Sequence, residues 1–249
     1  MLVPTREYLQ GAQALCRRYG ALFVLDEVQT GMYRTGPFLA AHHFGVDPDM
    51  VVMAKALSGG LVPCGAVLMS SAVSDSVYSS LQRAVIHTST HSEKSLAMRA
   101  GLATLDVLEE EHLGQRAATA GAVLRERLTA RLSNYEMVGA IRELGLLSAI
   151  EFKAPRRLRL KIPFEAFARI HPAMFGQVLV MRLFGDQRIL SQICGNNFMV
   201  LKVAPPLVIE DAQLDRYIDG VGKVVDLMHT SGSFWSEALG LARGALTTL

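Results

Sequence analysis

The chain has few of the features that mark disulfide-stabilised, secreted or membrane-spanning proteins. Its 249 residues include only three cysteines, Cys16, Cys64 and Cys194, and no CxxC pair. Such sparse cysteine usage fits a reducing compartment, so we expect a cytoplasmic protein. Charge interrupts every apolar run well before the about 18 residues that a membrane span needs. The N-terminus has neither the basic start nor the apolar centre of a signal peptide. We therefore expect no membrane partner.

An excess of one charge is also missing. The 25 Lys and Arg against 23 Asp and Glu leave a net charge of +2, too small for a nucleic-acid-binding surface. The sequence has no GxSxG, Walker A or GxGxxG motif, which argues against hydrolase, P-loop and dinucleotide-binding folds. Its histidines have no metal-ligand spacing, so we expect no metal site. Half of the residues are hydrophobic, as in a folded globular protein.

The N-terminal part has the pattern of an α/β fold, with a helix followed by short apolar strands. Thr5 is placed to cap the first helix, and Tyr8, Ala12 and Leu15 recur along it at helical spacing. The predicted elements are a helix over residues 5–19, a strand buried on both faces over 21–28, a loop with one helical turn over 29–48, and strands over 50–57 and 65–70.

The rest of the chain is predicted to contain a helical stretch and a smaller α+β domain. Helices are expected from residue 92 to about 132. Their apolar stripes run through Leu96, Ala100, Ala103 and Val107 in the first helix and Leu113, Ala117, Ala120, Leu124 and Leu128 in the second. Strands are predicted over 137–153 and 198–209, the latter stopped by Pro205 and Pro206, and a helix over 210–229. We place a domain boundary near residue 133, between domains of residues 1–133 and 134–249.

Charged residues follow two of the predicted strands. The first strand ends in Asp26, followed by Glu27, and the second runs into Lys55. In open α/β sheets, ligands bind just beyond the carboxyl ends of the strands, so Asp26 and Lys55 would face one crevice. The spacing alone leaves a plainer interpretation open, because charges at strand ends are often simply solvated at the rim of the sheet.

Longer segments around these residues point to a family. The segments are DEVQTGMYRTG (26–36), DPDMVVMAKALSGGLVPCGAV (47–67) and HTST (87–90), in that order before an Ala-rich helix. With them the chain resembles the class III aminotransferases, pyridoxal-phosphate enzymes of fold type I that include ornithine and acetylornithine aminotransferases. The resemblance runs from about Val3 to the C-terminal helix. It implies an α/β fold with a partial large domain and a C-terminal α+β small domain.

The resemblance also implies roles for individual residues. Asp26 matches the carboxylate that keeps the cofactor's ring nitrogen protonated, which pyridoxal phosphate needs to act as an electron sink. Lys55 matches the lysine that holds the cofactor covalently and later shuttles a proton, and burial at the end of an apolar strand would favour its neutral form. Val28 matches the side chain that packs on the ring, and Gln29 one near the ring hydroxyl. Thr90 matches a contact to the phosphate of the partner subunit, which implies a homodimer.

The sequence departs from the family in three places. Family members have an N-terminal half with a Ser-Gly-Thr loop that cradles the phosphate, and nothing in this sequence replaces that loop, so we expect the chain to be a C-terminal fragment. Thr90 is followed by residues 91–95 (HSEKS) instead of an aromatic residue and Gly-Gly-Asn-Pro. Lys202 stands where many members have an arginine that binds the substrate carboxylate in a bidentate manner. We expect 2-oxoglutarate or glutamate to bind less tightly, or differently, as a result.

The predicted function is transfer of an amino group from an amine or amino acid to a carbonyl acceptor. The alternatives are a non-catalytic relic and one half of a split enzyme that needs a partner polypeptide. Racemase-like chemistry shares the same lysine and aspartate. The basic segment 153–161 could meet an anionic substrate or a carrier protein, although we favour a solvated basic edge. The Met-bearing segment 174–184 could line a channel, although we favour a core helix.

Overall fold

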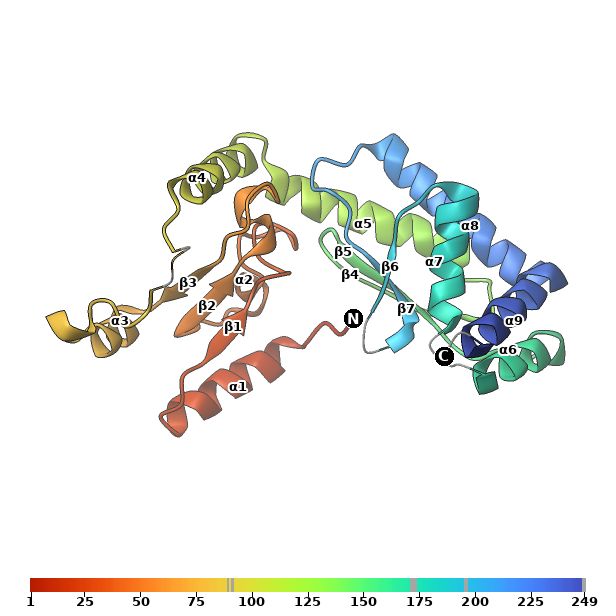
Figure 1. Ribbon diagram of the computed structural model, residues 1–249, viewed down its shortest axis with the longest axis horizontal. Helices are drawn as coiled ribbons and strands as arrows, with labels where there is room; N and C mark the ends of the chain where they lie inside the picture. Colours follow the sequence, from red (N-terminus) through yellow and green to blue (C-terminus); the bar gives the residue numbers. More distant parts are fainter. Residues whose placement is uncertain (89, 91, 171–173, 195–196, 248–249) are drawn as a thin grey trace. The chain divides into compact units, whose positions relative to one another are not determined.

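The structure, a computed structural model, describes residues 1–88, 90, 92–170, 174–194 and 197–247. It divides into an N-terminal unit, Pro4–Ala118, and a C-terminal unit, Met1–Val3 with Thr119–Leu249. Helix α5 (Leu113–Leu132) therefore contributes to both units (Figure 1). The sequence placed its boundary near residue 133, at the end of this helix, because the change in composition occurs there. In the structure, the boundary between the two units lies after Ala118, nearer the start of the helix.

The N-terminal unit begins as the sequence predicted. The hydroxyl of Thr5 accepts a hydrogen bond from the Tyr8 amide at 3.2 Å, and helix α1 runs to Arg18. The elements of this unit are α1 (Arg6–Arg18), β1 (Val24–Asp26), α2 (Ala41–Phe44), β2 (Met50–Met53), the 3-10 helix η1 (Lys55–Ser58), β3 (Ala66–Met69), α3 (Ser71–Val77), η2 (Leu81–Arg83) and α4 (Ser95–Glu110).

The three strands form one sheet in the order β1-β2-β3 (Figure 1). Strand β1 is parallel to β2, with Val24 paired with Met50 and Asp26 paired with Val52. Strand β3 is antiparallel to β2. A parallel pair needs a long crossover, which the loop with α2 provides. The parallel pairing brings the carboxyl ends of β1 and β2 to the same edge of the sheet.

Two expectations about burial in this unit were wrong. Strand β1 is shorter than predicted and is not buried on both faces, since 47% of Val24 and 54% of Leu22 are exposed. The stripe expected on α4 is also displaced, because Leu96 is 70% exposed and Val107 is 43% exposed. The buried positions of α4 are Ala97, Gly101 and Leu108. At Gly101 an added Cβ would lie 3.4 Å from the Leu57 carbonyl oxygen, so the packing of α4 against η1 sets its buried face.

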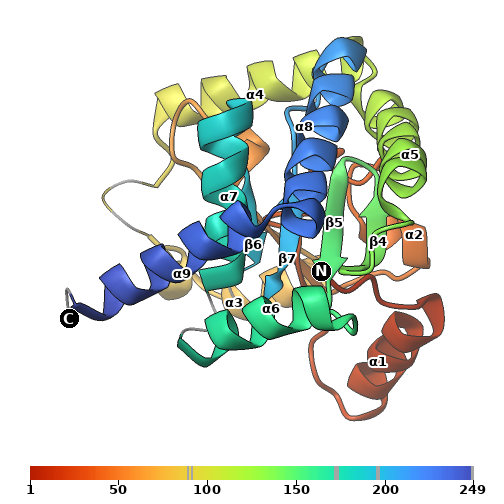
Figure 2. The ribbon, with the colours of Figure 1, turned by 90° about the vertical axis from the view of Figure 1, so that its right-hand side faces the viewer.

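The C-terminal unit is a four-stranded antiparallel sheet in the order β4-β5-β7-β6, with α5, α7 and α8 over one face (Figure 2). Helix α6 packs against α9. The elements that follow α5 are β4 (Val138–Leu144), β5 (Leu147–Phe152), α6 (Leu158–Ile170), α7 (Met174–Gln187), β6 (Gln192–Cys194), β7 (Asn197–Val203), α8 (Asp211–Thr230) and α9 (Gly232–Thr247).

Several predictions for this part of the chain are confirmed. The apolar stripe of α5 is buried along its whole length. The predicted turn between β4 and β5 contains Gly145 at φ +58°, and β7 ends at Val203, shortly before Pro205. The Met-bearing segment forms α7 and contributes Phe175 and Leu183 to the core, as a core helix should.

Within the described ranges, no helix is both long enough and apolar enough to cross a membrane.

Candidate functional site

Asp26 is the last residue of β1 at the edge where both parallel strands end. The next amide, that of Glu27, donates to the Val52 carbonyl of β2 at 2.9 Å and completes the ladder there. The Asp26 side chain is exposed, and its Oδ1 accepts a hydrogen bond from the Val28 amide at 3.0 Å. This bond orients the carboxylate against the turn that follows β1. The second oxygen, Oδ2, has no hydrogen-bond partner among the described residues.

Glu27 has a structural role that the sequence analysis did not find. Its side chain is buried, with 4% exposed. One carboxylate oxygen accepts from the Ala41 amide at 2.8 Å, and the other accepts from the Thr30 hydroxyl. Glu27 thus ties the turn after β1 to α2 and has no free oxygen for chemistry. In the sequence, the signal that could have indicated this role is Thr30, because a hydroxyl three residues after Glu27 can donate to its carboxylate across the turn.

Lys55 lies two residues beyond the end of β2, at the first position of η1. Its backbone is left-handed, with φ +49°, which is uncommon for a residue with a side chain. The expected burial of Lys55 is not observed, because its side chain is exposed. The turn itself is well anchored, since the buried Ser58 accepts a hydrogen bond from the Val62 amide at 3.4 Å and donates to the carbonyl of the same residue.

The other predicted contacts of the N-terminal unit lie in connections between its regular elements. Val28, half-buried, and Gln29, exposed, occupy the turn directly after Asp26. Thr90 is exposed in the connection between η2 and α4. Its neighbours Ser89 and His91 lie outside the described residues. The structure thus brings Asp26, its turn and Lys55 to one sheet edge and places Thr90 in a separate connection.

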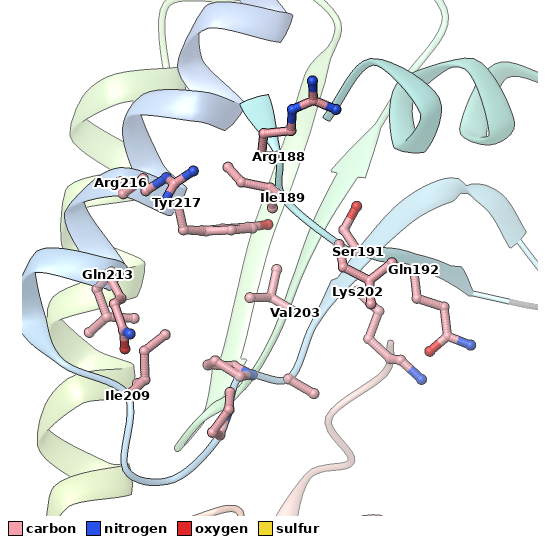
Figure 3. A pocket seen from close by; sticks show the side chains of 15 residues that line it. Arg188, Ile189, Ser191, Gln192, Lys202, Val203, Ile209, Gln213, Arg216 and Tyr217 are labelled. Carbon is pink, nitrogen blue, oxygen red and sulfur yellow. The ribbon is translucent and has the colours of Figure 1, made fainter. Parts of the chain in front are cut away.

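Lys202 belongs to the C-terminal unit. It lies on β7 opposite Gln192 of β6, and its side chain is half-buried. Together with Gln192 it lines a pocket of about 770 Å³ (Figure 3). Other residues of this pocket, among them Tyr217 and Ser191, were not singled out by the sequence, since a tyrosine on an amphipathic helix and a serine in a connection give no distinctive pattern.

The side chains at the strand ends fit pyridoxal phosphate by their chemistry. The cofactor has a ring nitrogen that a carboxylate keeps protonated, and an aldehyde that reacts with a primary amine. Asp26, the last residue of β1, has a carboxylate, and Lys55, just beyond the adjacent parallel strand β2, has a primary amine. The phosphate needs hydrogen-bond donors. Thr90 is the candidate that the sequence indicated for that part of the cofactor.

Comparisons with known proteins identify the family of the chain. The family described as aminotransferase class-III matches residues 1–225. The chain is 35% identical over 219 residues to putrescine aminotransferase of Pectobacterium atrosepticum, covering 88% of this chain and 42% of the relative. It is 34% identical over 225 residues to mitochondrial ornithine aminotransferase of Rattus norvegicus, covering 90% and 45%.

Solved structures show the same likeness. The ornithine aminotransferase of Toxoplasma gondii, which has pyridoxal phosphate at partial occupancy in its active site, matches with a TM-score of 0.74 and 32% identity. The alignment covers 90% of this chain and 47% of that protein. The chain thus spans somewhat less than half the length of the relatives that it matches, 42% of one and 45% of another.

Proposed function

Because the chain belongs to the class-III aminotransferase family, we propose that it supplies the lysine-bearing part of a pyridoxal-phosphate-dependent aminotransferase. The reaction would transfer an amino group from an amine or amino acid to a carbonyl acceptor. The observation that supports this most strongly is the position of Asp26 and Lys55, one at and one just beyond the carboxyl ends of two adjacent parallel strands.

Each of these residues has a defined task in the proposed reaction. When bound, pyridoxal phosphate supplies an electron sink for the substrate carbon that carries the amino group. Asp26 would hold a proton on the ring nitrogen through Oδ2, because Oδ1 is already engaged by the Val28 amide. Lys55 would hold the cofactor through its Nζ and then move a proton at the amine-bearing carbon of the substrate. Gln29 would contact the ring hydroxyl, and Val28 the ring face.

Because Asp26 and Lys55 are exposed, the proposed reaction requires further protein that keeps water out of the site. Excluding water strengthens the electrostatic interactions on which such a site depends. Within the described part of the N-terminal unit, both side chains remain exposed. We propose that protein equivalent to the rest of the relatives' length covers this edge and supplies the phosphate loop. A second polypeptide could supply it, as in a split enzyme, and a chain without it would be a relic.

The remaining roles are proposals of the same kind. The N-terminal unit would be the partial cofactor-binding domain and the C-terminal unit the small domain. Thr90 would reach the phosphate bound by a second copy, so the active form would be a homodimer. Lys202 would bind the substrate carboxylate. Cys16, Cys64 and Cys194 are all free thiols, which supports a reducing cytoplasmic location.

Release of an aldehyde from an amine donor tests the proposed function. Putrescine and ornithine, named for two of the relatives, are suitable donors. The chain would be incubated with pyridoxal phosphate and a donor, alone and with a polypeptide equivalent to the rest of the relatives' length. We expect Lys55→Ala to lower the release at least about a hundredfold. Lys223→Ala, which changes an exposed lysine on α8, should leave it unchanged. Equal release from Lys55→Ala and the wild-type chain would contradict the proposal.

A further inference from the structure

A second pocket of the C-terminal unit lies where the basic segment 153–161 joins β5 to α6. It has a volume of about 390 Å³, and small-molecule pockets in proteins usually have volumes of about 300–1,000 Å³. Its walls come from the connection between α5 and β4, from the basic segment with the first turn of α6, and from the end of α8. No residue lines both this pocket and the one that contains Lys202, so the two pockets are separate.

Three cations, Lys153, Arg157 and Arg159, line this second pocket. Contacts with the wall locate both guanidinium groups there. The Nη2 group of Arg159 donates to the Thr230 carbonyl at 2.7 Å, and Nε of Arg157 lies 3.7 Å from Oε2 of Glu136. The Lys153 side chain is exposed and has no ion-pair partner among the described residues. Positive charge from separate parts of the segment is thus collected around one hollow.

The acidic groups of the wall do not balance these cations. Among the ten described residues that line the pocket, Glu136 is the only acid. Its Oε1 accepts from the backbone amides of Arg156 and Arg157, the latter at 2.8 Å. Burial raises the pKa of Glu136, but these two amides lower it and the net shift is downward, so the carboxylate is charged at neutral pH. With His229 neutral, three cations and one anion leave the wall with a net charge of +2.

The rest of the wall is largely polar. Ser133 and Asn134, both exposed, add a hydroxyl and a carboxamide that can donate hydrogen bonds. A ligand that matches this wall has two negative charges and several acceptor oxygens. Phosphate has both, and guanidinium groups bind its oxygens through paired N–H donors. A monocarboxylate would balance only half of the charge.

We infer that this pocket binds a phosphate dianion, either as the free ion or as the phosphate group of a small ester. Arg157 and Lys153 pair with its charge, and Arg159 donates through Nη1. Ser133 and Asn134 donate to the remaining oxygens. The inference goes beyond the proposed function, because no residue of this pocket has a role in holding the cofactor or the amine.

Titration calorimetry of the full chain without pyridoxal phosphate tests this inference. The probes are inorganic phosphate, glycerol 3-phosphate and acetate, at about pH 8 and constant ionic strength, since phosphate is then a dianion. We expect one phosphate per chain and at least about tenfold weaker binding of acetate. Arg157→Gln and Lys153→Gln should each weaken phosphate binding about fivefold to fiftyfold. Tighter binding of glycerol 3-phosphate than of phosphate would support an ester as the ligand, and the reverse order would support the free ion.

Arg156→Gln is the matched control. It removes the same charge from the adjacent exposed arginine, which does not line the pocket, so the phosphate affinity should stay within about twofold of wild type. Because the Arg157 side chain is 85% exposed, Arg157→Gln should keep the melting temperature within about 2 °C, which separates a binding defect from a folding defect.

Three results would overturn the inference. The first is an equal loss of affinity in Arg156→Gln and Arg157→Gln, which would indicate attraction to the basic segment as a whole. The second is equal affinity for acetate and phosphate, and the third is no binding at millimolar phosphate. Lys55→Ala should bind phosphate as the wild type does, so this inference and the proposed function fail independently.

Discussion

Asp26 and Glu27 are adjacent in the sequence, but their carboxylates have opposite environments. Glu27 is 4% exposed and accepts hydrogen bonds from the Ala41 amide and the Thr30 hydroxyl. The Asp26 side chain is exposed, and its one hydrogen bond to a described residue comes from the turn that follows it. A cationic ligand at this sheet edge can therefore be paired by Asp26 and not by Glu27. This difference gives Glu27 a structural role and supports Asp26, the first acid of the pair, for the proposed chemical role.

Glu27→Ala should destabilise the N-terminal unit. The substitution removes a buried carboxylate and leaves the Ala41 amide without its acceptor. Hydrogen bonds to charged groups contribute about 1.5–3 kcal/mol each, so the loss of two such bonds should lower the free energy of unfolding by roughly 3–6 kcal/mol. Urea unfolding measures this change. Glu126→Ala, at an exposed glutamate of α5, is the control and should change stability by less than about 0.5 kcal/mol. A similar small effect of both variants would show that Glu27 is not the anchor of this turn.

Gly121→Ala should destabilise the C-terminal unit. A Cβ at Gly121 of α5 would overlap the backbone of Gly145, in the turn between β4 and β5. Because backbone cannot move aside as a flexible side chain does, we expect a loss of about 1–3 kcal/mol in the free energy of unfolding. Gly185→Ala in α7 is the matched control, since nothing lies within 4 Å of the added Cβ. It should stabilise the protein by up to about 1 kcal/mol, and an equal loss in both variants would contradict the explanation.

His229 makes the stability of the C-terminal unit depend on pH. Its Nε2 accepts a hydrogen bond from the Met137 amide at 3.2 Å, so its proton is on Nδ1, which donates to the Val225 carbonyl at 2.7 Å. Burial lowers the pKa of His229 below its ordinary value of 6.5, and the carboxylates of Glu136 and Asp226 offset only part of this effect. The folded protein therefore takes up a proton at this site less readily than the unfolded chain.

The direction of the pH effect follows from linkage. The stabilisation from neutral His229 is fully present above the unfolded-state pKa and is lost as the pH falls through 6.5 toward the lower folded-state value. Urea unfolding at about pH 7.5 and about pH 5.5 should show lower stability at the acidic pH. His229→Gln keeps an acceptor for the Met137 amide and should lose less stability between the two. The exposed His42→Gln should behave like the wild type. Identical pH dependence in all three proteins would be incompatible with this role for His229.

Lys202→Arg should change the use of dicarboxylate substrates, if Lys202 binds the substrate carboxylate as proposed. Arginine presents a planar pair of N–H donors, whereas lysine presents a point charge. In the active protein we expect the variant to lower the KM for 2-oxoglutarate about threefold to tenfold relative to wild type. The measurement compares KM values for 2-oxoglutarate and pyruvate. An unchanged preference between these acceptors would remove the carboxylate role from Lys202.

The sequence predicted elements well where local pattern and packing agree. The stripe of α5 from Leu113 to Leu128 has helical spacing and is also the side buried in the structure. Thr5 caps α1 through its own side chain, which is a local interaction. The same holds for Pro205, which cannot continue a ladder of backbone hydrogen bonds. Such features depend on the residue and its close neighbours, so a single sequence is enough to identify them.

Burial and pocket formation depend on distant contacts and could not be predicted in the same way. The apolar residues of α4 have a helical period, but the contact of α4 with η1 makes Gly101 one of the buried positions. Lys55 follows an apolar strand and yet is exposed, at the first position of η1. Tyr217 and Ser191 both line one pocket because α8 and the segment before β6, which are distant in the sequence, border it. The segment containing α9 was not predicted as a helix.

Reductive trapping tests the central claim, that Lys55 is the residue that holds the cofactor. The purified chain would be mixed with pyridoxal phosphate, reduced with borohydride and mapped by peptide mass spectrometry. The account predicts a single cofactor adduct on Lys55, absent from Lys55→Ala and weaker in Asp26→Ala. Adducts scattered over many lysines, with the same pattern in the wild type and in Lys55→Ala, would contradict it.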